Sequence, residues 1–185
     1  MIDLKNIIYA QTNTWPTYDE IEIEPNVFLA DFISIIYRDG VFKEIGRLLE
    51  SKEYPRCRGI GHIVLISICS AIDSLSAYAY GGGRVGTRFT GFISKYFPSR
   101  YSGSEQAIYD AFRCDSVHGW NLHKSVISPI PGDPDHLNPM NNIIRLSLYD
   151  FFNDLNKAFD DYAGQLRSDD NLGRNFLKRY KEIKR

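Results

Sequence analysis

The sequence predicts an all-α fold, a bundle of about five to six helices with a small β-hairpin. First, apolar residues repeat at 4-3-4-3-4 spacing through the segment 148–166, which is typical of a bundle helix. Second, the segment 59–80 is apolar on most sides, as expected for a central helix. Third, proline and glycine clusters separate these segments and no internal repeat is present. All 185 residues are therefore expected to form a single domain, 1–185.

The N-terminal part divides into an irregular segment and a helix. Residues 1–25 contain Pro16 and Pro25 and are predicted to be irregular. An apolar stripe then continues from about Val27 to Ser51, and Asn26 can cap its helix. Gly40 lies within the stripe and costs about 1 kcal/mol relative to alanine in a helix, so a break can occur there.

The central helix, 59–80, carries one acidic residue, Asp73. A buried carboxylate needs a partner, and Arg88 or Arg113 is the predicted one; the alternative is that Asp73 faces solvent. The glycine-rich segment 81–86 lacks the pattern of a phosphate-binding loop and is interpreted as a connector.

Shorter elements follow. Thr87 is predicted to cap a short helix that ends at Phe97, before a proline. Ser102 and Glu105 fit a capping box at the start of a helix over 104–118, which Gly119 can end.

After that helix, the sequence predicts strands and two helices. Val126-Ile127 and the segment 143–146 are predicted to pair as the hairpin, since a structureless loop of this length would be unusual. Ser147 is predicted to cap the helix 148–166, and Ser168 or Asp169 a last helix.

Charge, cysteine content and hydropathy limit the functional classes. The net charge of −1 argues against a wide basic surface for duplex nucleic acid. Five cations between positions 84 and 113 could still form a local basic groove, or an ordinary solvated surface. The three cysteines have no paired spacing, and the start lacks a signal-peptide pattern, which favours reduced thiols in the cytoplasm. The longest uncharged apolar stretch, 59–72, is too short to span a bilayer, so no membrane partner is expected.

The segment 113–119 carries the residues best suited to chemistry. His118 can transfer protons near neutral pH, and Arg113 stays charged and can hold phosphate oxygens with two donors. The two residues diverge by roughly 140° on an ideal helix. They can meet on one ligand if the helix unwinds at its end or if a second subunit completes the site.

This Arg-x4-His pattern, within Ile108-Tyr109-x-x-Phe112-Arg113-Cys114-x-x-Val117-His118-Gly119, resembles the signature of the HEPN superfamily, in a branch found in bacterial toxin–antitoxin and defence systems. The segment 86–98 is similar to the preceding helix of that branch, and the resemblance covers about residues 59–166. It implies a HEPN-like helical bundle and metal-independent cleavage of RNA to 2′,3′-cyclic phosphate ends. Arg113 and His118 would be catalytic, without a cofactor or metal.

The resemblance also implies a homodimer, in which the partner supplies a second histidine, and an antitoxin or nucleotidyltransferase as a protein partner. Asp115 or His123 could orient His118. Cys114 departs from the family, whose active members often carry Asn, Asp or His at this place. The candidate substrate-binding residues have cationic or aromatic side chains that suit RNA: Arg84, Arg88 and Trp120.

Other interpretations of these residues remain open. Arg113 and His118 could merely tie a helix end to its neighbours, or the domain could be a non-catalytic HEPN-like module that binds a nucleotide, RNA or a protein. The side chains of Cys114, His118, His123 and His136 are of types that bind zinc, but their spacing matches no known zinc finger. A Cys114–His118 nucleophile pair has no third orienting group in the sequence.

Overall fold

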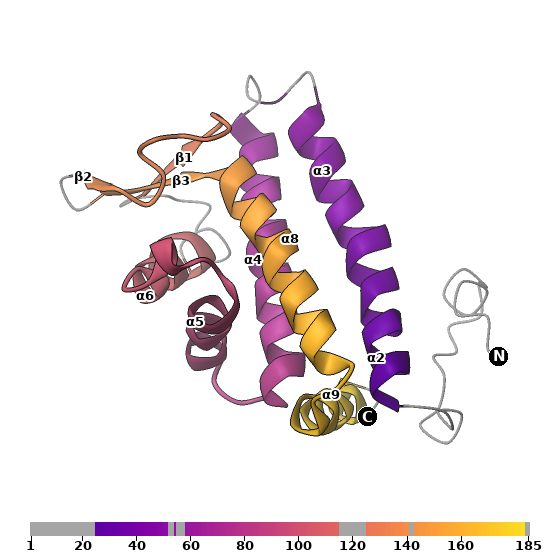
Figure 1. Cartoon of the computed structure of the whole chain (residues 1–185). Helices are drawn as coiled ribbons and strands as arrows, with labels where there is room; N and C mark the ends of the chain where they lie inside the picture. Colours follow the sequence, from indigo (N-terminus) through magenta and orange to yellow (C-terminus); the bar gives the residue numbers. More distant parts are fainter. Residues whose placement is uncertain (1–24, 52–53, 55–57, 115–124, 141–142, 184–185) are drawn as a thin grey trace.

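The computed structural model describes residues 25–51, 54, 58–114, 125–140 and 143–183. Most of these residues are helical, and the helices pack as a bundle with a small sheet beside one end (Figure 1). The predicted all-α class is therefore confirmed. The predicted irregular segment 1–25 lies outside the described residues except for Pro25, which begins a helix.

The first helix is continuous from Pro25 to Glu50 but changes its winding at its centre. It consists of α2 (Pro25–Ser34), the π-helical segment η2 (Ile35–Phe42) and α3 (Lys43–Glu50). Gly40, where a break was predicted, lies inside η2. The chain thus stays helical at this glycine and takes up the irregularity as a wider turn. Before this turn the helix packs on α8 and α9, and after it on α4.

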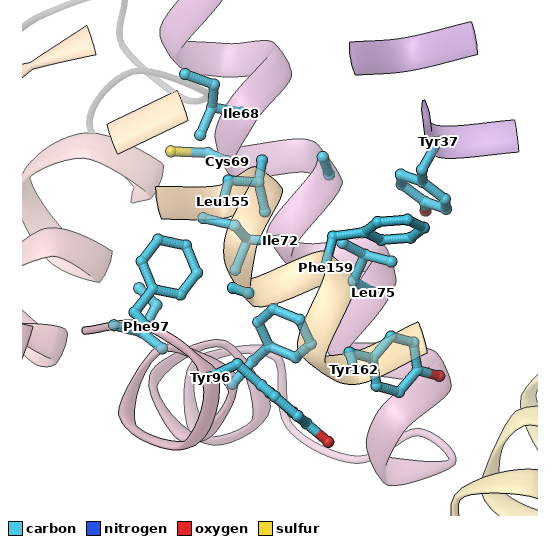
Figure 2. Close-up of a cluster of buried hydrophobic side chains, with 14 of the residues drawn as sticks. Tyr37, Ile68, Cys69, Ile72, Leu75, Tyr96, Phe97, Leu155, Phe159 and Tyr162 are labelled. Carbon is cyan, nitrogen blue, oxygen red and sulfur yellow. The ribbon is translucent and has the colours of Figure 1, made fainter. Parts of the chain in front are cut away.

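The helix α4 (Arg58–Tyr80) is the centre of the bundle, as predicted, and contacts α3, α5, α8 and α9. Figure 2 shows its inward side chains, among them Ile68, Ile72 and Leu75, facing Phe159 and Leu155 of α8. All five are fully or almost fully buried.

Within the described residues, Gly59–Tyr80 is long and apolar enough to cross a membrane by length and composition alone. The helix is longer than the uncharged stretch seen in the sequence because it continues past Asp73. Buried core helices have the same composition, and α4 is surrounded by other helices. The absence of a membrane partner stays a prediction.

Two helices follow at the side of α4. The first, α5 (Val85–Tyr96), ends before Pro98 as predicted, but its N-cap is Arg84, so the prediction of a Thr87 cap was wrong. The next begins with α6 (Glu105–Ile108) and continues as the π-helical segment η4 (Tyr109–Cys114).

The capping box of Ser102 and Glu105 was also wrong. The N-cap is Ser104, and its side chain accepts no capping hydrogen bond. The reason is local: a short 3-10 turn, η3 (Ser99–Tyr101), is followed by Gly103 at φ 82°, so the chain turns before the helix can start.

The sheet contains β1 (Ser125–Ser128), β2 (Pro139–Met140) and β3 (Ile143–Ser147) in the order β1-β3-β2. The predicted pairing of β1 with β3 is present, but it is parallel, so these two segments do not form a hairpin. Between them the chain crosses over and adds β2, which is antiparallel to β3. The connection is long enough for such a crossover, and its prolines disfavour a direct two-residue turn.

The C-terminal helices, α8 (Leu148–Leu166) and α9 (Asp170–Ile183), lie where they were predicted. The hydroxyl of Ser147 accepts a hydrogen bond from the backbone N–H of Asp150 at 3.2 Å, which confirms the predicted cap of α8. For α9 the cap is Asp169, whose carboxylate accepts from the N–H groups of Asn171 and Leu172.

Candidate functional site

The centre of the candidate site is an ion pair between α4 and the end of η4. Arg113 donates from Nε and Nη2 to the same carboxylate oxygen, Oδ2 of Asp73, at 3.0 and 2.8 Å. The side chains of both residues are 18% exposed, so the pair lies just below the surface. Because two donors converge on one oxygen, the plane of the guanidinium group is fixed.

A second arginine lies on the other side of the same carboxylate. Nη2 of Arg88, from α5, is 3.6 Å from Oδ1 of Asp73. Nη1 of Arg88 donates to the carbonyl of Gly83 at 2.7 Å, which ties α5 to the glycine loop. Both arginines proposed from the sequence as partners of Asp73 are therefore confirmed, and the alternative of a solvent-facing Asp73 is wrong.

The glycine loop brings α5 back alongside α4. Gly81, Gly82 and Gly83 have φ values of 66°, 105° and 98°, which side-chain-bearing residues rarely adopt. The loop is thus a tight connector, as interpreted from the sequence, and it lets Asp73 and Arg88 face each other fifteen positions apart.

The charges of the three side chains leave one net positive charge. Burial lowers the pKa of Arg113, but the hydrogen bonds and charge of Asp73 outweigh that effect and raise it. Arg113 is therefore a permanent cation at any physiological pH. Two cations around one anion give a partly buried cluster that favours an incoming anion.

Tyr109 and Cys114 complete the cluster. The guanidinium carbon of Arg113 is 5.8 Å from the centre of the Tyr109 ring, and Cys114 is a half-buried free thiol. Burial and a hydrogen bond with Cys114 raise the pKa of the Tyr109 hydroxyl, so it stays protonated. Gly86 makes room for this ring, since a Cβ atom there would lie 3.1 Å from Cε1 of Tyr109.

The predicted site residues are only partly brought together. Arg113 and Arg88 lie around Asp73, and Cys114 lies beside Tyr109, while Arg84 is exposed at the start of α5. The other four lie outside the described residues: Asp115, His118, Trp120 and His123. The approach of His118 to Arg113 therefore stays a prediction.

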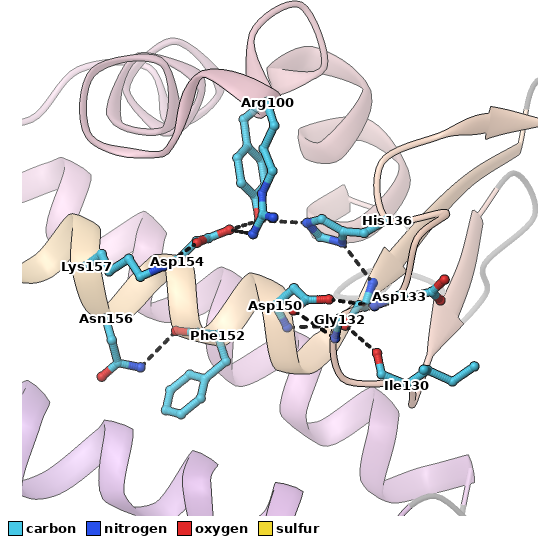
Figure 3. A network of polar contacts seen from close by, with 12 residues as sticks. Arg100, Ile130, Gly132, Asp133, His136, Asp150, Phe152, Asp154, Asn156 and Lys157 are labelled. Atoms are coloured by element: carbon cyan, nitrogen blue, oxygen red, sulfur yellow. Dashed lines mark hydrogen bonds and ion pairs between the residues drawn. The ribbon is translucent and has the colours of Figure 1, made fainter.

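A second polar network, which the sequence reasoning missed, joins the sheet to α8 (Figure 3). Arg100 forms an ion pair with Asp154, which is 1% exposed. The hydroxyl of Tyr101 donates to Asp154 at 3.0 Å and lies 3.0 Å from Nε2 of His136. Nδ1 of His136 accepts from the backbone N–H of Ser147 at 3.1 Å. The sequence feature that could have indicated this network is Asp154, an acidic residue on the apolar face of a helix.

This network changes the zinc interpretation. Both ring nitrogens of His136 already have hydrogen-bond partners, so this histidine is not available as a ligand in this arrangement. No group of three or more His, Cys, Asp or Glu side chains suited to a metal occurs within the described ranges.

Comparisons with models of protein families, with curated proteins and with solved structures found no match for this chain.

Proposed function

We propose that this chain is a HEPN-like protein that cleaves RNA without a metal, using Arg113 and His118. The observation that supports this best is the position of Arg113. Asp73 fixes its guanidinium group at the end of η4, Arg88 lies beside it, and the segment with His118 follows at once. A fixed guanidinium group with a neighbouring cation suits the charge that develops on a phosphate group during cleavage.

The reaction uses a nucleophile from the substrate. A base removes the proton of a 2′-hydroxyl, whose oxygen bonds to the adjacent phosphorus. The bond from phosphorus to the 5′ oxygen breaks, and an acid returns a proton to that oxygen. The products are a 2′,3′-cyclic phosphate and a 5′-hydroxyl. His118 supplies one of the two proton transfers, and Arg113 stabilises the oxygens of the phosphorane.

The second proton-transfer group would come from a second copy of the chain. We therefore include a homodimer in the proposal, with the Arg113–His118 segments facing each other across a two-fold axis. The family setting adds a cytoplasmic location and a toxin–antitoxin or defence role with an antitoxin or nucleotidyltransferase partner. Analytical ultracentrifugation tests the dimer: a monomer at micromolar concentration that keeps full activity would reject it.

A second function is favoured by one observation, the engagement of Arg113. Two of its N–H groups already go to Asp73, and Cys114 stands where active family members often carry a stronger hydrogen-bonding side chain. A non-catalytic HEPN-like module, which binds a nucleotide, RNA or a protein at the same place, would need no further polar group there.

The deciding experiment is cleavage of total RNA and of tRNA by purified protein with EDTA present. His118→Ala and Arg113→Lys should both abolish cleavage, because the first removes the proton-transfer group and the second the planar pair of donors. Arg174→Lys, on the exposed face of α9, is the matched control and should keep wild-type activity. The products should carry 2′,3′-cyclic phosphate, and a 2′-deoxy substrate should resist.

Two other outcomes are informative. Equal cleavage by wild type and His118→Ala would indicate a contaminating nuclease and reject this site. Binding of RNA by all folded variants, without cleavage by any, would favour the non-catalytic module.

A further inference from the structure

Asp73 takes part in none of the bond-making or proton-transfer steps described above, yet three elements meet at its side chain. It is the only acid on α4, a helix that otherwise serves the core. It binds Arg113, forty residues away on η4, and faces Arg88, fifteen residues away on α5. A carboxylate on a central helix destabilises the fold unless it is paired with a cation. The two arginines therefore offset the cost of burying Asp73.

The two arginines are held differently. Arg113 makes two hydrogen bonds to Oδ2, and its position is further limited by the Tyr109 ring. Arg88 is 3.6 Å from Oδ1, beyond hydrogen-bond distance. Among the described residues, neither Oδ1 of Asp73 nor Nε of Arg88 has a hydrogen-bond partner, although both atoms are buried.

This difference gives the two cations different freedom. Arg113 cannot turn without breaking two charge-assisted hydrogen bonds. Arg88 makes no hydrogen bond to Asp73, so a turn toward an anion that enters beside Asp73 is opposed only by its longer ion pair and by its hydrogen bond from Nη1 to the carbonyl of Gly83, while Nε gains an acceptor. With one net positive charge on the cluster, a singly charged phosphodiester would neutralise it.

We propose that Asp73 is a positioning residue of the RNA site: it fixes Arg113 in the orientation that receives the phosphate, and it holds Arg88 beside it as the cation that turns to the same phosphate. This inference rests on the proposed function. The opposite role is a blocking one, in which Asp73 competes with the phosphate for Arg113. The two roles predict opposite effects when the carboxylate is removed.

The test compares Asp73→Asn, Asp73→Glu and a control, Asp154→Asn. Asp154 is also a buried acid paired with an arginine, but it joins η3 to α8 and has no part in the site. The probe is a 2′-O-methyl RNA oligonucleotide, which can bind but offers no nucleophile. Affinity is measured by fluorescence anisotropy, and folding is checked by thermal unfolding.

Asp73→Asn should weaken RNA binding at least tenfold, and Asp73→Glu should recover part of the loss. Asp154→Asn should lower the melting temperature and leave the affinity within twofold of wild type. If Asp73→Asn binds as tightly as the control, the positioning role is rejected. If it binds more tightly than wild type, Asp73 blocks the site instead.

A further readout separates this inference from the proposed function. In wild type, the Nε–H group of Arg113 should give a slowly exchanging NMR signal, which Asp73→Asn should remove and Asp154→Asn should keep. If wild type binds no RNA, the proposed function fails, and the positioning role fails with it even where this signal behaves as expected. If wild type binds RNA but the Arg113 signal is the same in Asp73→Asn, only the positioning role fails.

Discussion

Nδ1 of His136 accepts a hydrogen bond from the backbone N–H of Ser147 at 3.1 Å, so this nitrogen carries no proton in the folded protein. The ring proton is then on Nε2, where it is donated to the hydroxyl of Tyr101. A doubly protonated His136 would leave the Ser147 N–H without its acceptor. The fold therefore requires the neutral ring.

Stability should fall in mildly acidic solution for this reason. Burial, followed by the positive charge of Arg100, lowers the pKa of His136 below 6.5, and the carboxylates of Asp133, Asp150 and Asp154 only partly oppose this. The unfolded chain binds the proton more readily, so the stabilisation is complete above about pH 6.5 and decreases as the pH falls below it. Thermal unfolding between pH 8 and pH 5 checks this against His136→Asn, whose amide oxygen can replace Nδ1 as acceptor. A variant with the same pH dependence as wild type would contradict it.

Tyr101→Phe should destabilise the protein by about 1–3 kcal/mol, because it leaves partners of a buried hydroxyl unsatisfied. Tyr162→Phe is the matched control. Tyr162 is fully buried on α8, and its hydroxyl has no hydrogen-bond partner within the described part of the chain. Removal of the Tyr162 hydroxyl should therefore destabilise the protein little or stabilise it slightly. Urea unfolding measures the free energy of unfolding of both variants. Equal changes in the two would show that the hydrogen bonds of Tyr101 do not contribute to stability.

Phe159→Ala should cost about 3–5 kcal/mol, a large part of the stability of a domain of this size. Its ring is fully buried on α8 and packs edge-on against Phe42, with centroids 5.3 Å apart. Ile183→Ala, at a position 57% exposed near the end of α9, should change the stability by less than about 0.5 kcal/mol. Urea unfolding measures the free energy of unfolding of both variants.

Gly164→Ala should stabilise the protein by about 0.5–1 kcal/mol, because glycine is a poor residue inside a helix. Nothing lies within 4 Å of the Cβ atom that alanine would add at this position of α8. At Gly173 of α9 the added atom would clash with Oδ1 of Asn26, so Gly173→Ala should gain less or lose stability. If Gly173→Ala raised the melting temperature more than Gly164→Ala, the result would contradict the packing around Asn26.

The sequence predicted the long helices well because burial imposes its period on them. The segment 148–166 carries that period over many residues, and the segment 59–80 is apolar on most sides over a similar length; α8 and α4 match them closely. The partners of Asp73 could be predicted for a related reason, since a charge on an apolar helix requires an opposite charge. The same reasoning applied to Asp154 would have led to Arg100.

The remaining errors arise where the fold depends on the path of the chain. Apolar residues in β1 and β3 indicate that both are strands, but the direction of their pairing depends on the crossover between them. Helix starts such as Arg84 and Ser104 depend on where neighbouring glycines turn the chain. For the candidate site, the charge cluster was predictable from the sequence, whereas the geometry between Arg113 and His118 lies outside the described residues.

The π-helical segment in the first helix lets that helix lose a residue without changing the side that it buries. A deletion of Gly40, inside η2, would let the segment return to regular α-helical winding. Because a π turn holds about one residue more than an α turn, the tighter winding largely offsets the lost residue. Ile45 and Leu49, now buried against the bundle, would therefore still face it. A deletion of one residue here thus shortens the helix but leaves the same side of α3 against the core.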